Sequence, residues 1–256
     1  MHKQGGNLSL ETFNIYKWIE STKQLLAEKD WEAVSKEKSK LKICLKEYSE
    51  VGSKAIYIVK RDSILYRGRI YKEEDRFRRW ADYDNSEGQQ FRGYGEAESF
   101  INLDVAKVED GRCNRKNEPC LYVSEKRETC YVELRPQANT LISLAEIIVT
   151  SPLKVLDLSS SGAVADTMKM AETGFALNLE LNRPVYDSEN GYAFTQLVAE
   201  CVKELGFDGV RYSSAFNTLT HRDRGKNMAI FNFEKCKACS SELVLVNSVD
   251  VCVEYK

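Results

Sequence analysis

The chain has 256 residues, of which 43% are hydrophobic and 30% charged, values typical of one folded domain with or without a small appendage. This composition argues against a disordered chain, and no apolar run reaches the ~18 residues that a membrane span needs. The 37 basic residues nearly balance the 39 acidic ones, so bulk charge attracts the chain neither to nucleic acid nor to an anionic membrane.

Residues 11–48 predict two amphipathic helices joined by a tight turn. Apolar residues recur at helical spacing in both halves, and Asp30 stands where the second helix needs an N-cap. The remaining positions are mostly Lys and Glu, as on a solvated face. The apolar stripe must therefore pack on something else: the rest of the chain, a second copy or a partner protein.

The middle of the chain predicts short strands. We expect strands at 55–59 and 63–70, loops and short helices in the charged stretch 71–119, and a strand at 121–124. A short helix over 125–132 is expected to begin at Ser124 as its N-cap. Two further strands are predicted at 146–150 and 154–158.

The last third begins with an amphipathic helix at 192–205, which Gly206 is expected to end in the left-handed conformation. A strand at 209–212, a polar loop at 214–226 and a strand at 228–233 follow, and a closing hairpin is predicted within 243–255. Because the strands are short and do not alternate regularly with helices, the pattern predicts an α+β fold.

Eight cysteines are scattered along the chain. The first residues lack the apolar segment of a secretory signal peptide, so we expect a reducing, cytoplasmic location and buried thiols rather than disulfides. The closest pair, Cys236 and Cys239, has no second Cys/His pair to complete a zinc site, and the only histidines are His2 and His221. We therefore predict no metal.

Common catalytic motifs are missing. The sequence has no phosphate-binding G-x-x-x-x-G-K-[ST] loop, no G-x-G-x-x-G turn and no G-x-S-x-G elbow. A Ser-His-Asp triad would depend on His221 alone, in a predicted loop. Any chemistry must therefore come from another set of polar residues.

Three groups of polar residues stand at strand and helix ends. Arg67 and Arg69, two apart on one predicted strand, share a face and are either surface residues or a binding site for an anion such as a pyrophosphate. Glu133 is either paired with Arg135 or faces a cleft. Ser214 lies where a strand enters a polar loop, a frequent place for ligand contacts and equally for a serine turn.

The order of segments resembles the RES domain family, named for an arginine, a glutamate and a serine. The segments that carry the resemblance are LYRGRI (65–70), GRCN (111–114), LYVSEKRETCYVELRP (121–136), ISLAEIIVTSPLKVLDLS (142–159), YAFTQLVAECVKELGFDGVRYSS (192–214) and GKNMAIFNF (225–233). FRGYGEAESF (91–100) resembles the subgroup with an N-terminal helical region related to HEPN domains. We divide the chain into this helical region, residues 1–54, and a RES domain, residues 55–256.

The resemblance assigns site residues one by one. The family's name residues fall on Arg67, Glu133 and Ser214, although the doublet with Ser213 leaves the serine open. The binding residues carried over from the family are Arg112, Tyr122 and Asn227. Arg69, the second arginine of the LYRGRI segment, is added to them. The sequence departs from the family where the Asn-Pro of G-R-x-N-P is Asn114-Arg115, and where INLD (101–104) replaces a proline pair.

The resemblance implies an ADP-ribosyltransferase-like fold of short mixed or antiparallel strands that cleaves the nicotinamide–ribose bond of NAD+, by phosphorolysis or by hydrolysis. NAD+ is then a substrate, inorganic phosphate a possible co-substrate, and no cofactor is required. Family members are typically toxins held inactive by an antitoxin, often of the Xre type. A homodimer is the commonest alternative assembly, and no direct nucleic-acid or membrane partner is expected.

Three other functions are alternatives to this one. Mono-ADP-ribosyl transfer to a macromolecule would use the same Arg67 and Glu133 and differ in its product. A non-enzymatic interaction module would keep the fold without the chemistry. A HEPN-type ribonuclease is nearly excluded, because no histidine lies between His2 and His221 to complete its R-x₄₋₆-H motif.

Overall fold

The computed structural model describes residues 14–51, 55–71, 87–101, 104–159, 168–184, 191–216 and 225–249. Its α-helices are α1 (Ile15–Glu28), α2 (Trp31–Val51), α4 (Glu96–Phe100), α5 (Arg127–Glu133), α6 (Met168–Asn182) and α7 (Ala193–Glu204). Its strands are β1 (Ile56–Val59), β2 (Ile64–Ile70), β3 (Leu121–Ser124), β4 (Leu141–Val149), β5 (Leu153–Asp157), β6 (Gly209–Ser213), β7 (Lys226–Ile230) and β8 (Cys236–Leu245). No helix among these residues is both long and apolar enough to cross a membrane.

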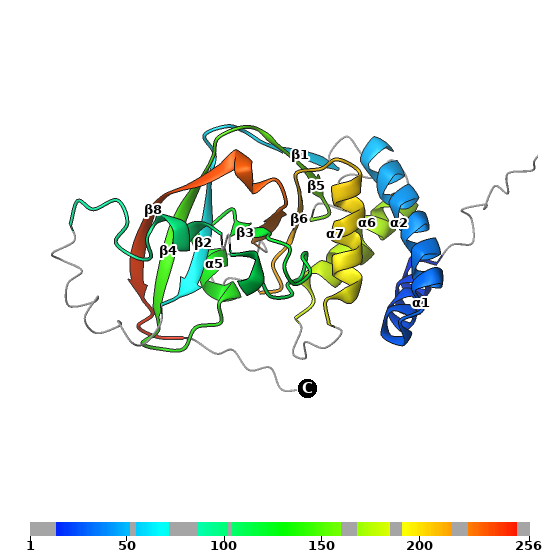
Figure 1. Cartoon of the computed structure of the whole chain (residues 1–256), viewed down its shortest axis with the longest axis horizontal. Helices are drawn as coiled ribbons and strands as arrows, with labels where there is room; N and C mark the ends of the chain where they lie inside the picture. The colour runs from blue at the N-terminus through cyan, green and yellow to red at the C-terminus, as the bar shows by residue number, and fades with distance from the viewer. Residues whose placement is uncertain are drawn as a thin grey trace, which may run out of the picture.

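The strands form one mixed sheet in the order β1-β5-β6-β7-β3-β2-β4-β8. Strands β5 and β6 run parallel, and the other neighbours run antiparallel. Helices α1, α2, α6 and α7 gather at one end, beside β5 and β6, and α5 lies against the strands at the other (Figure 1). This arrangement confirms the predicted α+β class with a helical pair preceding the sheet.

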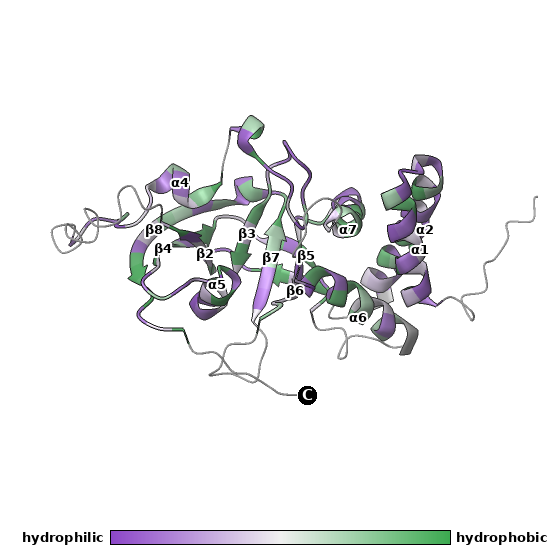
Figure 2. Cartoon of the chain, turned by 90° about the horizontal axis from the view of Figure 1, so that it is seen from below, coloured by the Kyte–Doolittle hydropathy of each residue, from purple (hydrophilic) through white to green (hydrophobic). Residues whose placement is uncertain are grey.

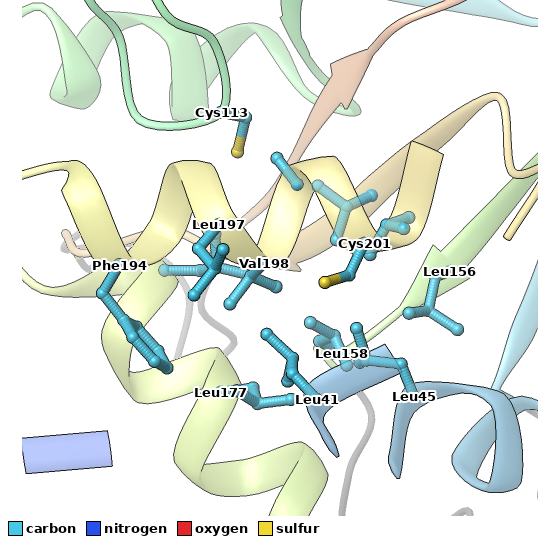
Figure 3. Packing of buried hydrophobic residues seen from close by; sticks show 14 of the residues in the cluster. Leu41, Leu45, Cys113, Leu156, Leu158, Leu177, Phe194, Leu197, Val198 and Cys201 are labelled. Carbon is cyan, nitrogen blue, oxygen red and sulfur yellow. The ribbon is translucent and has the colours of Figure 1, made fainter. Parts of the chain in front are cut away.

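The helical pair is part of the main core. Leu41 and Leu45 of α2 lie beside Leu156, Leu177 and other side chains of β5, α6 and α7, all of them buried (Figure 3). Burying each such side chain contributes roughly 1.5–3 kcal/mol, so α1 and α2 are held firmly. Of the three possible surfaces for their apolar stripe, the structure shows docking on the rest of the chain.

Polar contacts strengthen this docking. The hydroxyl of Tyr48 donates a 3.0 Å hydrogen bond to the carbonyl oxygen of Asp157 at the end of β5. At the surface, Lys38 forms ion pairs with Glu200 and Glu204 of α7, and Lys23 of α1 pairs with Glu180 of α6. Because these surface pairs remain partly hydrated, they contribute less than the apolar contacts beneath them.

Two predicted helix ends are confirmed and one is wrong. The carboxylate of Asp30 accepts a hydrogen bond from the Ala33 N–H, as an N-cap does, and Gly206 has a φ of +79° after α7. Ser124 does not cap α5, which follows Lys126 without a side-chain cap. Its hydroxyl instead bonds to Asn227 on the neighbouring strand β7.

Other differences from the sequence predictions lie in the second half of the chain. Helix α6 was not predicted, and β4 begins five residues before the expected strand at 146–150. The strand expected at 228–233 runs from 226 to 230, and a 3-10 helix, Phe233–Lys235, comes after it. The first half of the closing hairpin expected within 243–255 belongs instead to the end of β8, which pairs with β4. Residues 250–256, its second half, lie outside the described residues.

Candidate functional site

A cavity of about 500 Å³ opens where the sheet divides. Strands β2 and β3 share one paired position, Tyr66 opposite Ser124, whereas β2 pairs with β4 along its whole length. The cavity is lined by Tyr66, Arg67, Gly68, Gly111, Arg112, Tyr122, Val123, Ser124, Cys130, Glu133, Leu134, Arg135, Tyr192, Tyr212, Phe216 and Asn227. Neighbouring residues of a strand normally point to opposite faces of the sheet. Because β2 and β3 separate here, consecutive residues of both strands line the same cavity.

Helix α5 closes one side of the cavity, and a glycine lets it approach β2. A Cβ added to Gly68 would lie 2.9 Å from Leu134 Cδ1 and 3.4 Å from Cys130 Cβ. A larger residue would therefore push α5 away from the strand. Helices α4 and α5 lie on opposite faces of β2, β4 and β8 (Figure 2).

Glu133, at the C-terminus of α5, faces the cavity. Its Oε1 accepts hydrogen bonds from Ser214 Oγ and from Asn227 Nδ2, both at 2.6 Å. Ser214 is fully buried, and its Oγ also accepts a 3.0 Å bond from the Phe216 N–H. The structure thus brings together Glu133, Ser214 and Asn227, all assigned to the site from the sequence. Of the two alternatives for Glu133, pairing with Arg135 or facing a cleft, the structure shows that it faces the cavity.

The doublet of serines is divided between two roles. Ser213 Oγ accepts bonds from Asn178 Nδ2 at 3.3 Å and from Lys226 Nζ at 3.2 Å, and its N–H donates to Asn178 Oδ1. These contacts tie β6 to α6, whereas the following serine, Ser214, reaches Glu133. Geometry therefore favours Ser214 as the member of the doublet that belongs to the site.

Arg67 supplies a partly buried positive charge. Its Nη1 is out of contact with solvent and has no hydrogen-bond partner among the described residues. Burial and the neighbouring positive charge of Arg69 lower the pKa of Arg67 to about 10, so it stays charged at neutral pH. A buried guanidinium nitrogen without a hydrogen-bond partner is costly, and an anionic ligand that accepted from it would relieve that cost.

Arg69 is placed differently from the prediction. It lies beside Arg67 on the same face of β2 but does not line the cavity. Its Nη1 donates to the carbonyl oxygen of Glu98 at 2.5 Å, and its guanidinium lies 5.8 Å from the centre of the Tyr94 ring. The structure therefore brings one arginine of this pair, and not the other, to the candidate site.

The loop with Arg112 is held from two sides. Tyr122 Oη accepts a 2.7 Å bond from the Cys113 N–H and donates one of 2.8 Å to Asn114 Oδ1. Gln196 of α7 directs its Nε2 at the carbonyl oxygens of Gly111 and Asn114 and at Asp110 Oδ1, at 2.9–3.1 Å. Sequence reasoning missed Gln196, although an amide on the inward face of an amphipathic helix is a signal of such a role.

Arg112 itself lies at the wall of the cavity. Its Nη1 donates to the Arg183 carbonyl oxygen at 3.0 Å, and its guanidinium lies 5.7 Å from the centre of the Tyr192 ring. Arg135 lies 4.6 Å from the Phe216 ring centre and has a φ of +47°, in the left-handed region. Sequence reasoning did not assign Arg135 or Phe216 to the site, although Arg135 stands in the quoted segment ending in Arg-Pro.

The charges of the cavity wall are unequal. Three arginines, Arg67, Arg112 and Arg135, line it together with one carboxylate, that of Glu133. The aromatic rings of Tyr122 and Tyr212 also line it, and burial raises the pKa of both tyrosines well above the usual value, so their hydroxyls stay neutral. Such a wall suits an anionic ligand with a flat ring.

Metal ligands do not gather in the part of the chain that is described. It contains no group of three or more His, Cys, Asp or Glu side chains placed to hold an ion. Cys236 is buried in β8, Cys239 Sγ donates to the Glu146 carbonyl oxygen, and both histidines lie outside the described residues.

The fold and site define an α+β domain whose divided sheet holds an arginine-rich cavity with one fixed carboxylate. A sequence profile of the RES domain matches residues 79–250, and the chain belongs to the RES domain family. The comparison with curated proteins gave no match.

Among solved structures, the chain is similar to one in the crystal structure of the M. tuberculosis MbcT-MbcA toxin-antitoxin complex. The two are 14% identical, with a TM-score of 0.45, and the match covers 79% of this chain and 92% of that one.

Proposed function

We propose that this protein degrades NAD+ by cleaving the bond between nicotinamide and ribose, and that it acts as a toxin by depleting NAD+. The observation that carries the proposal is the Glu133 carboxylate, which Ser214 and Asn227 hold at the wall of a cavity that Arg67 also lines. The toxin role rests on the resemblance of the sequence to RES toxins.

Glu133 suits the charge that develops in this reaction. Nicotinamide leaves as a neutral molecule and needs no general acid, whereas the ribose becomes positively charged as the bond breaks. A fixed carboxylate stabilises such a cation without reorganising, which is the main source of electrostatic catalysis. Because both donors bind Oε1, we assign Oε2 to the ribose.

The arginines suit the rest of the substrate. The Arg67 guanidinium, whose buried Nη1 has no hydrogen-bond partner in the described part of the chain, would bind the pyrophosphate of NAD+ or an attacking inorganic phosphate. Arg112 and Arg135 add positive charge to the same wall, and the tyrosine rings would contact the nicotinamide. The reaction transfers a glycosyl group and no electrons, so NAD+ enters as substrate and not as cofactor.

The partner and the location belong to the same proposal. A toxin that depletes NAD+ must be restrained in the cell that makes it, so we propose an antitoxin partner, of the Xre type by family resemblance, and action in the cytoplasm. A homodimer of this chain is the alternative assembly, and sedimentation of the isolated and co-expressed protein would separate the two.

The test is product analysis by proton and phosphorus NMR. The purified chain is incubated with NAD+ in phosphate buffer and in phosphate-free buffer, with Glu133→Gln as the matched control. Nicotinamide release with a new sugar-phosphate signal means phosphorolysis, and release with free ADP-ribose means hydrolysis. Folded wild-type protein that releases no nicotinamide, or that leaves ADP-ribose attached to an added macromolecule, would contradict the proposal.

A further inference from the structure

Ser124 stands at the point where the sheet divides. It is the one residue of β3 that pairs with β2, opposite Tyr66, and it also pairs with Asn227 on β7. Its backbone is therefore fixed from both sides, and the residue as a whole is 5% exposed. Directly opposed residues in antiparallel strands present their side chains on the same face, so Ser124 and Asn227 meet there.

The hydroxyl of Ser124 and the carboxylate of Glu133 hold the Asn227 amide from its two ends. Ser124 Oγ donates to Asn227 Oδ1 at 2.6 Å, and Asn227 Nδ2 donates to Glu133 Oε1, also at 2.6 Å. An amide turned the other way would place Oδ1 against the carboxylate, so that two acceptors would meet. The carboxylate, which can only accept, therefore decides which way the amide points, and the Ser124 hydroxyl, by donating to Oδ1, holds the amide in that place from the side away from Glu133.

We infer that Ser124 is a positioning residue for Glu133 and acts through the Asn227 amide. The expected effect of Ser124 on the reaction rate rests on the proposed function, whereas its expected effect on the Asn227 amide does not. Ser124, Asn227 and Ser214 then form one arrangement in which both donors to Oε1 are fixed before a ligand enters. Such preorganisation matters more in the transition state than in substrate binding, so it belongs to kcat rather than to KM.

The variants are Ser124→Ala, which removes the donor, and Ser124→Thr, which keeps it. The matched control is Ser241→Ala on β8, because Ser241 is also a buried strand serine, and its hydroxyl donates at 2.7 Å to the Tyr94 carbonyl oxygen, away from the cavity. Initial rates of nicotinamide release give kcat and KM for each protein. For Ser124→Ala we expect kcat to fall roughly tenfold, below the ~100-fold loss typical of a direct donor, while KM changes little.

A second measurement does not depend on turnover. The side-chain amide signal of Asn227 in a nitrogen-15 NMR spectrum, assigned by its loss in Asn227→Asp, reports the bond to Glu133. We expect this signal to move in Ser124→Ala and to stay in place in Ser124→Thr and Ser241→Ala. If wild-type protein releases no nicotinamide, the proposed function fails while this spectrum still decides the role of Ser124. An unmoved signal in Ser124→Ala, or a kcat unchanged in an active enzyme, would overturn the inference.

Discussion

The hydroxyl of Ser214 lies 2.6 Å from Glu133 Oε1, although 81 residues separate them in the chain. Ser214 directly follows β6, whose pairing with β7 ends at Ser213, and Glu133 is the last residue of α5, which lies between β3 and β4 in the chain. The contact therefore exists only when both halves of the divided sheet are in place. This dependence links the site directly to the fold.

Substitution of Arg67 and Arg69 should have unequal effects. Arg67→Ala removes the partly buried charge that lines the cavity, and we expect at least a ~100-fold loss in NAD+ cleavage, as with other electrostatic groups in active sites. Arg69→Ala is the matched control, because Arg69 shares the strand face but contacts Glu98 and Tyr94 instead. Nicotinamide release measures both variants, and equal losses would contradict the assignment.

The two adjacent serines should separate activity from stability. Ser214→Ala removes a donor to Glu133, so we expect a large fall in kcat, up to ~100-fold, with the fold retained. Ser213→Ala removes bonds to Asn178 and Lys226, so we expect a loss of about 1 kcal/mol in the free energy of unfolding and a nearly normal kcat. Urea unfolding and kinetics on the same samples check both. The reverse result would assign the site to Ser213.

Replacing Gln196 with glutamate, which has nearly the same shape, should strongly destabilise the fold. Gln196, which is 6% exposed, donates to three acceptors, one of which is the carboxylate of Asp110. Gln196→Glu would place a second carboxylate against these acceptors. We expect a loss of at least about 3 kcal/mol in the free energy of unfolding. The control is Gln24→Glu on the exposed side of α1, where Gln24 donates to Glu28, and it should cost no more than about 0.5 kcal/mol. Comparable losses in the two variants would refute the buried role.

Buried cysteines should make the fold less stable in alkali. Burial raises the pKa of the Cys113 thiol from 9.0 to about 12. Between these values the unfolded chain releases a proton that the folded chain keeps, so stability present below pH 9 is lost as the pH rises. At pH 10 this thiol alone lowers the free energy of unfolding by about 1.4 kcal/mol relative to neutral pH.

Urea unfolding of the wild type and of Cys113→Ala across pH 8–10 measures that loss. The variant should be less stable at every pH, because it leaves a cavity, but its stability should fall less steeply. Parallel curves for the two proteins would show that Cys113 does not titrate as its burial demands.

Most helices and strands are predictable where their pattern is local. α1, α2 and α7 have apolar residues at helical spacing, and the strands at 55–59, 63–70 and 121–124 are short apolar runs between turn residues. Helix α6 is not predictable from its pattern, because its buried residues include polar as well as apolar ones. It therefore lacks a clear division into an apolar and a polar face. The capping role assigned to Ser124 failed because a hydroxyl bonds to whichever acceptor is nearest in space, here one that is 103 residues away.

The sequence by itself determined the α+β class and the amphipathic helices, because these follow from residue types and spacing along the chain, and its resemblance to the RES family assigned Arg67, Glu133 and Ser214 to the predicted site. Only the tertiary structure decided that Arg69 lies outside the cavity, that Ser214 rather than Ser213 reaches Glu133, and that Ser124 bonds to Asn227 and Gln196 to the loop with Arg112. The physical reason is that the cavity forms where β2 and β3 separate, and strand separation arises from pairings between distant segments.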